Sequence, residues 1–170
     1  PEDGYGWEKL FSERMCRHFT EDFGLETRVV RYHNVYGPLG TYDGGREKAP
    51  AAICRKIANA KMNNINEIEV WGDGEQTRDF TYIENVVQMN VRAMLTENSD
   101  CFGKCFNVAY GSRMSINELY FGIRDLLAQF DPEINKIDPN YTEERAGDIK
   151  HSIADITMAK DLLGYNPEYD

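Results

Sequence analysis

The segment Tyr5-Gly6-Trp7-Glu8-Lys9 organises the interpretation of this chain, because it places a tyrosine and a lysine four residues apart at the head of an amphipathic stretch. Residues i and i+4 share one face of a helix, so the phenol and the ammonium group are expected to point into the same space. A fixed cation nearby favours the phenolate form of a tyrosine. The pair is therefore a candidate proton shuttle, although most pairs with this spacing are a half-buried ring beside a solvated charge.

The residues after this pair predict a helix followed by a strand. Apolar residues recur close to a 3.6 period from Tyr5 to Phe23, and Gly24 follows as a typical C-terminal glycine. This pattern predicts a helix with a buried face. The next segment, Thr27 to Tyr32, is short and rich in β-branched residues, and a loop with glycine and proline follows it, so we expect a strand.

Further along the chain, the same criteria predict three more helices and two more strands. The helices are expected at residues 49–60 and 84–95 and after Ser115, where Ser115-Ile116-Asn117-Glu118 has the form of a capping box. Strands are expected at residues 67–71, where polar and apolar residues alternate and a turn at Gly72-Asp73-Gly74 follows, and at residues 105–109. Residues 61–66 are expected to be a surface loop, and residues 131–140 a linker.

Composition restricts the class of protein. The chain has 170 residues, of which 41% are hydrophobic and 28% charged, which suits a globular unit with a sizeable core. The net charge of −10 argues against nucleic-acid binding, although a local cluster of arginines and lysines can still bind an anionic ligand. Four cysteines do not suggest a disulfide framework, and we expect no metal site. The sequence shows no membrane-spanning run and no secretory start, so we expect a cytoplasmic protein without membrane partners.

The Tyr5–Lys9 pair resembles the catalytic Tyr-x-x-x-Lys motif of the short-chain dehydrogenase/reductase superfamily, and five further segments narrow the resemblance to its extended, NAD-dependent nucleotide-sugar epimerases and dehydratases. The segments are Arg31-Tyr32-His33-Asn34-Val35-Tyr36-Gly37-Pro38, Gly44-Gly45-Arg46-Glu47-Lys48-Ala49-Pro50, Trp71-Gly72-Asp73-Gly74 running into Arg78-Asp79-Phe80, Phe106-Asn107-Val108, and Arg145-Ala146-Gly147-Asp148 with Ala154-Asp155. Together these segments span nearly the whole chain.

The resemblance implies an α/β fold, namely the C-terminal half of a Rossmann-like doubly wound parallel sheet plus the small substrate-binding domain. Residues 1–36 are expected to end the NAD-binding domain. Residues 37–170 are expected to form mainly the substrate-binding domain, with Rossmann-like elements interleaved near 67–110. No Gly-rich pyrophosphate-binding turn occurs in these residues, so the N-terminal half of the family's enzyme is expected to be missing.

The resemblance implies catalytic roles for Tyr5, Lys9 and Lys48, and a cofactor contact for His33. Tyr5 is expected to move the hydroxyl proton, and Lys9 to lower the phenol's affinity for its proton and to bond the nicotinamide ribose of NAD. His33 is expected to line the nicotinamide with its backbone, or to be a packed histidine, without a role in proton transfer. Lys48 resembles a lysine that acts as an acid/base at a sugar carbon in GDP-mannose 3,5-epimerases.

The expected substrate is a nucleotide-diphosphate sugar, and eight residues match the family's substrate contacts. Asn34 could instead cap a turn, Arg55 could replace Lys56 at the diphosphate, and Arg78 could be an exposed loop arginine. The eight residues are Asn34, Glu47, Lys48, Lys56, Gln76, Arg78, Arg145 and Asp148.

Two members of the family compete as the template. Residues 1–80 resemble GDP-mannose 3,5-epimerase, and residues 81–170 resemble the UDP-N-acetylhexosamine 4-epimerases. We expect the 3,5-epimerase activity, through a transient keto intermediate, with a UDP-N-acetylhexosamine 4-epimerase, a 4,6-dehydratase or a non-catalytic sugar-nucleotide-binding fragment as alternatives. The full-length enzyme is expected to be a homodimer through the Tyr5 helix, and these residues alone are expected to be inactive and to bind NAD weakly.

Overall fold

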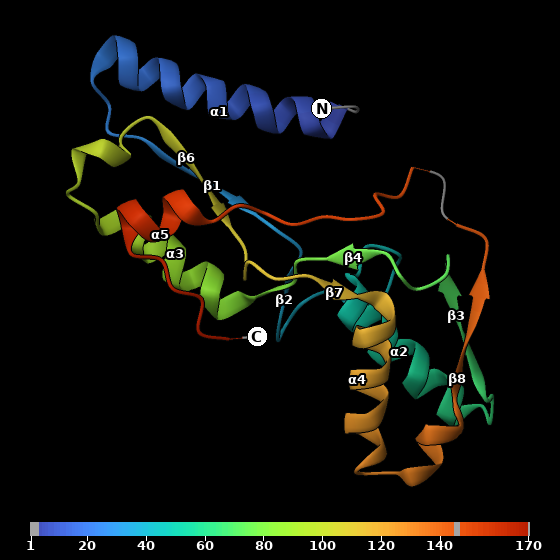
Figure 1. Cartoon of the computed structure of the whole chain (residues 1–170). Coiled ribbons are helices and arrows are strands. Elements are labelled where there is room, and N and C mark those ends of the chain that lie inside the picture. The colour runs from blue at the N-terminus through green and yellow to red at the C-terminus, as the bar shows by residue number, and fades with distance from the viewer. Residues whose placement is uncertain (1–3, 145–146, 170) are drawn as a thin grey trace. The chain divides into compact units, whose positions relative to one another are not determined.

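The computed structural model describes residues 4–144 and 147–169, and the chain divides into two compact units (Figure 1). The first unit comprises Pro1–His33, Thr81–Gly111 and Ala154–Asp170, and the second comprises Asn34–Phe80 and Ser112–Ile153. Each unit is therefore assembled from segments that are distant in sequence. The domain boundaries predicted from the resemblance stay a prediction.

The first unit is built on two parallel strands, β1 (Arg28–Tyr32) and β6 (Lys104–Val108), which pair in register from Arg28 opposite Lys104 to Tyr32 opposite Val108. Helix α3 (Ile83–Leu95) packs on both strands, and α5 (Thr157–Leu163) packs on α3 and β6. Helix α1 (Gly4–Phe23) lies on the other side of the strand pair (Figure 1). The unit also contains β5 (Thr81–Tyr82) and the short helix η1 (Ser99–Cys101).

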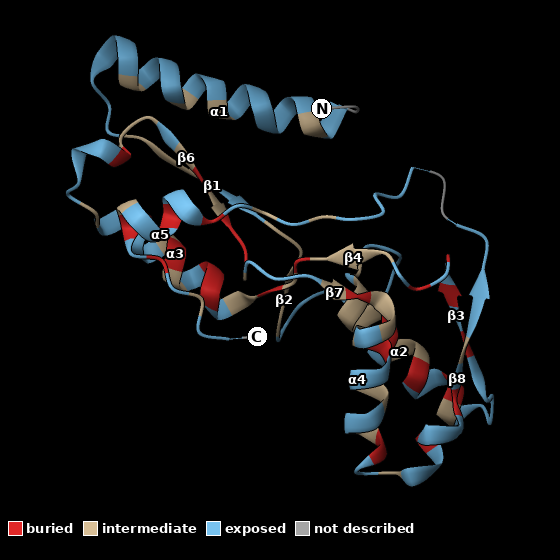
Figure 2. Cartoon of the chain, viewed as in Figure 1, coloured by how far each residue is buried: buried red, intermediate tan, exposed pale blue. Residues whose placement is uncertain are grey.

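The predicted helix–strand pair is confirmed, but the predicted buried face of α1 is wrong. No residue of α1 is buried, and Figure 2 shows the helix coloured as exposed or intermediate along its length. The side of α1 that faces β1 is polar instead: Thr20 and Thr27 share a hydrogen bond of 2.6 Å, and Arg31 binds both carboxylate oxygens of Glu13. The exposed stripe consists of Leu10, Phe11, Met15, Phe19 and Phe23.

The second unit packs two helices around a pair of strands. Helix α2 (Ala49–Met62) and helix α4 (Ile116–Ala128) contact each other, and β3 (Glu67–Trp71) pairs in parallel with β8 (Asp138–Thr142). Alternate residues of β3 are buried, as the sequence alternation predicts. The core consists of Ile53, Ile57, Ala60, Ile68, Val70, Tyr120, Ala128, Ile134 and Ile137.

Two predictions in this unit are wrong. Residues 131–140 are not a linker, because the 3-10 helix η2 (Pro132–Lys136) and the start of β8 fall there. Strand β3 pairs with β8, which begins 67 residues beyond the end of β3. Pro139 and the turn-forming residues beside it hide β8 from a pattern search, since proline cannot donate to a strand ladder. Helix α2 also extends into the predicted loop, to Met62.

The predicted turn and cap that join these elements are confirmed. Gly74 has a φ of +77°, and a Cβ at this position would lie 2.0 Å from Asn117 Oδ1, so only glycine fits. Both hydrogen bonds of the capping box between Ser115 and Glu118 are present at the start of α4. The short strands are β2 (Val35–Tyr36), β4 (Thr77–Arg78) and β7 (Met114–Ser115), of which β4 and β7 pair antiparallel. None of the described helices is long and apolar enough to cross a membrane.

Candidate functional site

The Tyr5 and Lys9 side chains lie together on the exposed face of α1, as their spacing predicts. The Lys9 Nζ atom is 5.1 Å from the centroid of the Tyr5 ring, and it is 3.6 Å from Glu8 Oε1. Tyr5 remains 69% exposed. A phenol and an ammonium group in this arrangement can bind one ligand together, with the hydroxyl able to exchange a proton and the ammonium able to donate hydrogen bonds.

His33 and Asn34 follow the C-terminal end of β1. The His33 backbone N–H donates to the Val108 carbonyl at 3.0 Å, which continues the pairing of β1 with β6 by one residue. Asn34 has a φ of +37°, and its Nδ2 donates to the Asp79 carbonyl at 3.2 Å. This bond joins Asn34 to backbone 45 residues further along the chain. The turn-capping alternative and a substrate contact for the Asn34 side chain both stay predictions.

Lys48 immediately precedes α2 and lines an open cleft of about 310 Å³ within the second unit. Arg46 lines the same cleft, so two cationic side chains reach one space. The rest of the lining comes from residues 35–41 and 50–54 and includes two glycines, a proline and Cys54. This cleft can bind an anionic or hydroxyl-rich ligand beside an exposed amine.

Glu47 turns away from solvent and pairs with Arg55 of α2. The Arg55 Nη2 donates to Glu47 Oε1 at 2.5 Å, and the Glu47 side chain is only 8% exposed. The nearby backbone N–H of Glu47 and the Arg55 guanidinium hold the pKa of the Glu47 carboxyl below its usual range, so the group is a carboxylate at neutral pH.

Lys56, the predicted diphosphate contact, points toward β3. Its Nζ donates to the Glu69 carbonyl at 2.7 Å and lies 3.7 Å from Glu69 Oε2. Its neighbour Arg55, the alternative cation, is engaged with the loop before α2. The structure therefore gives both cations protein partners, and neither lines the cleft that contains Lys48.

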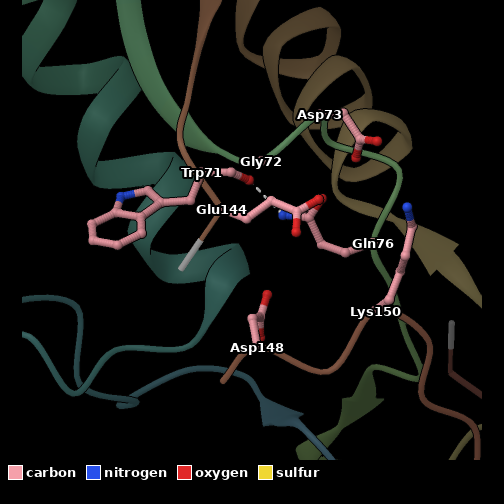
Figure 3. A pocket seen from close by; sticks show the side chains of 7 residues that line it. All are labelled: Trp71, Gly72, Asp73, Gln76, Glu144, Asp148 and Lys150. Carbon is pink, nitrogen blue, oxygen red and sulfur yellow. Dashed lines mark hydrogen bonds between the residues drawn. The ribbon is translucent and has the colours of Figure 1, made fainter. Parts of the chain in front are cut away.

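Gln76 lies in a small cavity of about 30 Å³ next to the turn at Gly72 (Figure 3). Its Nε2 donates to the Trp71 carbonyl at 2.6 Å, whereas its buried Oε1 has no hydrogen-bond partner among the described residues. The cavity is lined by Trp71, Gly72, Asp73, Gln76, Glu144, Asp148 and Lys150. It therefore presents an unpaired acceptor, several carboxylates and one lysine.

Arg78 is held beside this cavity by Asp148. The Arg78 Nη2 donates to Asp148 Oδ1 at 2.6 Å, its Nη1 donates to the Thr77 carbonyl at 2.8 Å, and the side chain is 16% exposed. The backbone of Thr77 is bonded on both sides to the chain after Asp148, through Lys150 and Ser152. The structure thus brings together Gln76, Arg78 and Asp148, which are up to 72 residues apart. Arg145 lies outside the described residues.

Five residues that line the Gln76 cavity are absent from the predicted set of substrate contacts: Trp71, Gly72, Asp73, Glu144 and Lys150. Trp71 carried a usable signal, since it directly precedes the Gly72–Gly74 turn. Glu144 and Lys150 carried none, because their position depends on β8, the strand that the sequence pattern hides. The bond between Arg55 and Glu47 was also missed.

Comparisons with known proteins extend these observations. Residues 1–109 match the NAD dependent epimerase/dehydratase family. GDP-mannose 3,5-epimerase 1 of Oryza sativa is 40% identical over 167 residues, which cover 98% of this chain and 40% of the relative. The chain thus spans half or less of the length of these curated relatives.

Two solved structures share the fold. The UDP-N-acetylglucosamine 4-epimerase of Methanobrevibacter ruminantium, in complex with UDP-N-acetylmuramic acid, superposes with a TM-score of 0.82 at 33% identity, over 99% of this chain and 49% of that one. The UDP-glucose 4-epimerase of Thermotoga maritima, with UDP-glucose, gives 0.81 at 31% identity, over 98% and 48%. These matches confirm the predicted Rossmann-like α/β class. The chain belongs to the NAD dependent epimerase/dehydratase family.

Proposed function

We propose that the full-length protein is an NAD-dependent epimerase of a nucleotide-diphosphate sugar that works through a transient keto intermediate, in the manner of the GDP-mannose 3,5-epimerases. The observation that carries this proposal is the exposed Tyr5–Lys9 pair, with the ammonium 5.1 Å from the ring centroid. The likeness to the Oryza sativa enzyme at 40% identity supports the choice of reaction.

In this proposal Tyr5, as phenolate, removes the proton of a sugar hydroxyl, and Lys9 stabilises that phenolate. The chemistry that NAD would supply when bound is reversible acceptance of the hydride from the same carbon. The exposed Lys9 ammonium has three donors, which suits the hydroxyls of a ribose. These residues fit only the nicotinamide end of the cofactor, since no Gly-rich turn for its pyrophosphate occurs in the 170 residues.

The ketone makes the hydrogen on the adjacent carbon acidic, and Lys48 is proposed to deliver or accept that proton. Its place on an open cleft, beside Arg46, supports this role. A 3,5-epimerase needs a second acid/base group, for which the described residues offer no assigned candidate.

The substrate's nucleotide and diphosphate are proposed to bind at the second unit through Gln76, Arg78 and Asp148, with Arg145 as a further arginine by resemblance. Arginine suits this role because its planar guanidinium binds phosphate oxygens in pairs. The convergence of the first three residues at one cavity supports the proposal. Contacts of Asn34, Glu47 and Lys56 with the substrate stay proposals on the resemblance alone.

Lys48→Met in the full-length enzyme tests the proposed function. The substitution removes the amine and keeps the length of the side chain, so epimerisation should stop while oxidation by Tyr5 and NAD survives. In D₂O the unmodified enzyme should place deuterium on the sugar carbons that it inverts. Lys61→Met is the matched control, because Lys61 lies in the last turn of α2 and pairs with Asp131 at 3.0 Å, and it should leave turnover unchanged.

The second candidate is a UDP-sugar 4-epimerase, favoured by the two solved structures with TM-scores above 0.8. A 4-epimerase returns the same hydride to the same carbon, so no proton moves at carbon. Product free of deuterium after complete turnover would therefore exclude the 3,5-epimerase proposal and favour this one. A 4,6-dehydratase would release water, and a non-catalytic fragment would give no product at all.

We also propose that the full-length protein is a homodimer. The exposed apolar stripe of α1 supports this proposal, because a row of five large apolar side chains is costly to leave in water. Light scattering of the full-length protein measures its oligomeric state directly, and a monomer would contradict the proposal. The cytoplasmic location stays a prediction from the sequence.

A further inference from the structure

Arg55 ties the loop that carries Glu47 to helix α2 at both ends of that loop. Its Nε donates to the Tyr42 carbonyl at 2.8 Å, and its Nη2 donates to Glu47 Oε1 at 2.5 Å. Asp43 Oδ1 lies 3.9 Å from the same Nε. The Arg55 guanidinium therefore bonds both ends of residues 42–47, a segment that we call the Arg55 loop.

The middle of the Arg55 loop has little else to hold it. Gly44 and Gly45 have φ angles of +90° and +79°, and a Cβ placed on either would meet no atom within 4 Å. Two successive glycines without packing gain much conformational freedom when the loop opens. Other ties of the loop are local: the Gly44 N–H donates to Asp43 Oδ1 at 2.8 Å, and the backbone of Gly45 and of Glu47 bonds the Glu47 carboxyl.

The Arg55–Glu47 pair is strong for a pair so close to a cleft. Glu47 is 8% exposed and Arg55 29%, so water screens their attraction less than at a surface pair. A guanidinium can donate to a carbonyl and a carboxylate at once because its donors are fixed in one plane, whereas lysine offers a single point of charge. The other Glu47 oxygen, Oε2, is buried and has no hydrogen-bond partner among the described residues.

We propose that Arg55 is a positioning residue that fixes Glu47, and with it Lys48, for chemistry at the sugar carbon, and that Arg55 is not a ligand of the diphosphate. The role of Lys48 in this statement rests on the proposed function, whereas the tie between Arg55 and the loop does not. Of the two roles open to Arg55, the positioning role is favoured because its Nε and Nη2 donors both bond the loop.

The first test measures the loop without substrate. Hydrogen–deuterium exchange in the full-length enzyme should show the amides of residues 43–48 exchanging at least about tenfold faster in Arg55→Met, because local opening no longer breaks an ion pair. Arg55→Lys should fall between, since it keeps the charge but loses the fork. Unchanged exchange in Arg55→Met would overturn the proposal.

Two further variants make this measurement specific. Glu47→Gln keeps the shape of the side chain and removes the charge, so it should accelerate exchange in the same loop, and the effect should not add to that of Arg55→Met. Arg124→Met is the matched control, because Arg124 is 18% exposed and pairs with Asp125 at 3.0 Å on α4. It should leave the exchange of the Arg55 loop unchanged.

The second test separates positioning from diphosphate binding. In Arg55→Met, kcat should fall by about 10- to 100-fold, since a displacement of about 1 Å has effects of this size. The Kd of GDP and of UDP, which carry the diphosphate without the sugar, should stay within about twofold. If the Kd rises by about tenfold or more while loop exchange stays normal, Arg55 is a diphosphate ligand. If kcat stays normal although the loop exchanges faster, the positioning role is excluded.

These outcomes separate the two proposals. If Lys48→Met leaves epimerisation intact but Arg55→Met loosens the loop and lowers kcat, the assignment of Lys48 fails and the positioning role of Arg55 stands. If Lys48→Met stops epimerisation but the loop does not respond to Arg55→Met, the positioning role fails alone.

Discussion

Helices α1 and α4 carry similar sequence signals and have different surroundings. Both repeat apolar residues at helical spacing, and both were predicted as helices from that pattern. Helix α4 begins at a complete capping box and buries Tyr120 and Ala128 in the core of its unit. Helix α1 buries no residue and leaves its apolar stripe exposed (Figure 2).

The difference shows what hydrophobic periodicity measures. The pattern identifies a face that is costly to expose, but it does not say which segment covers that face. In α4 the covering segments are α2 and η2 of the same unit. In α1 the side toward β1 is instead held by polar contacts of Glu13 and Thr20.

The largest expected effect on the free energy of unfolding distinguishes the buried face of α4 from the exposed stripe of α1. Tyr120→Ala should lower the free energy of unfolding of the 170-residue chain by about 3–5 kcal/mol, because Tyr120 is fully buried and its loss leaves a cavity. The substitution also removes the hydrogen bond that the Tyr120 hydroxyl donates to the Ile137 carbonyl at 2.6 Å. Phe11→Ala, at a side chain that is 65% exposed, should change the value by no more than about 0.5 kcal/mol.

Urea unfolding of the two variants measures both values. A cost for Phe11→Ala as large as that for Tyr120→Ala would mean that the stripe of α1 is covered in solution, and the contrast between the helices would disappear. Repeating the measurement at several protein concentrations would then show whether a second copy covers it.

A smaller effect is expected at the start of α4. Ser115→Ala removes the side chain that accepts the Glu118 N–H at 3.1 Å, and losing such a cap costs about 1 kcal/mol. Ser12→Ala is the matched change in α1, where the hydroxyl donates to the Glu8 carbonyl at 3.0 Å in mid-helix. Because alanine favours helix interiors, this variant should be neutral or slightly stabilising. Thermal unfolding compares the two, and equal losses would contradict the capping argument.

The smallest effect is a pH dependence of the same cap. The Ser115 backbone N–H and hydroxyl hold the pKa of the Glu118 carboxyl below its usual value of 4.5. A lowered pKa means that this stability is present above about pH 4.5 and is lost as the pH falls through the folded value. Glu118→Gln should therefore lose less stability than the parent chain between about pH 5 and pH 3. A parallel loss in both would show that Glu118 contributes nothing to the acid response.

The sequence predicted the elements better than their partners. Helices α2, α3 and α4 and strands β1, β3 and β6 follow from local periodicity and caps, which act over a few residues. Strand β8 could not be recognised, because Pro139 and its exposed neighbours give no period-2 signal and the strand forms by pairing with the distant β3. Likewise, the convergence of Gln76 with Asp148 needed the motif resemblance, since nothing local links residues that far apart.

The same limit applied to Arg55. In the sequence, Arg55 and Lys56 were equivalent candidates for the diphosphate contact. Only the structure shows Arg55 bonded to Glu47 and Tyr42. Which cation reaches which carboxylate depends on the path of the loop, and the two left-handed glycines that set this path are visible in the sequence only as turn formers.

The parallel pairing of β3 with β8 has a consequence for how the chain is made. A ribosome releases β3 long before β8, and the second unit remains open while residues 81–111 of the first unit are synthesised. Until Thr142 emerges, Ile68 and Val70 lack the strand beside them. The edge of β3 therefore stays unpaired while about seventy residues are synthesised. Pairing across such a separation is slow to form. During the interval between these two strands, the unpaired edge of β3 therefore makes the nascent chain prone to aggregate.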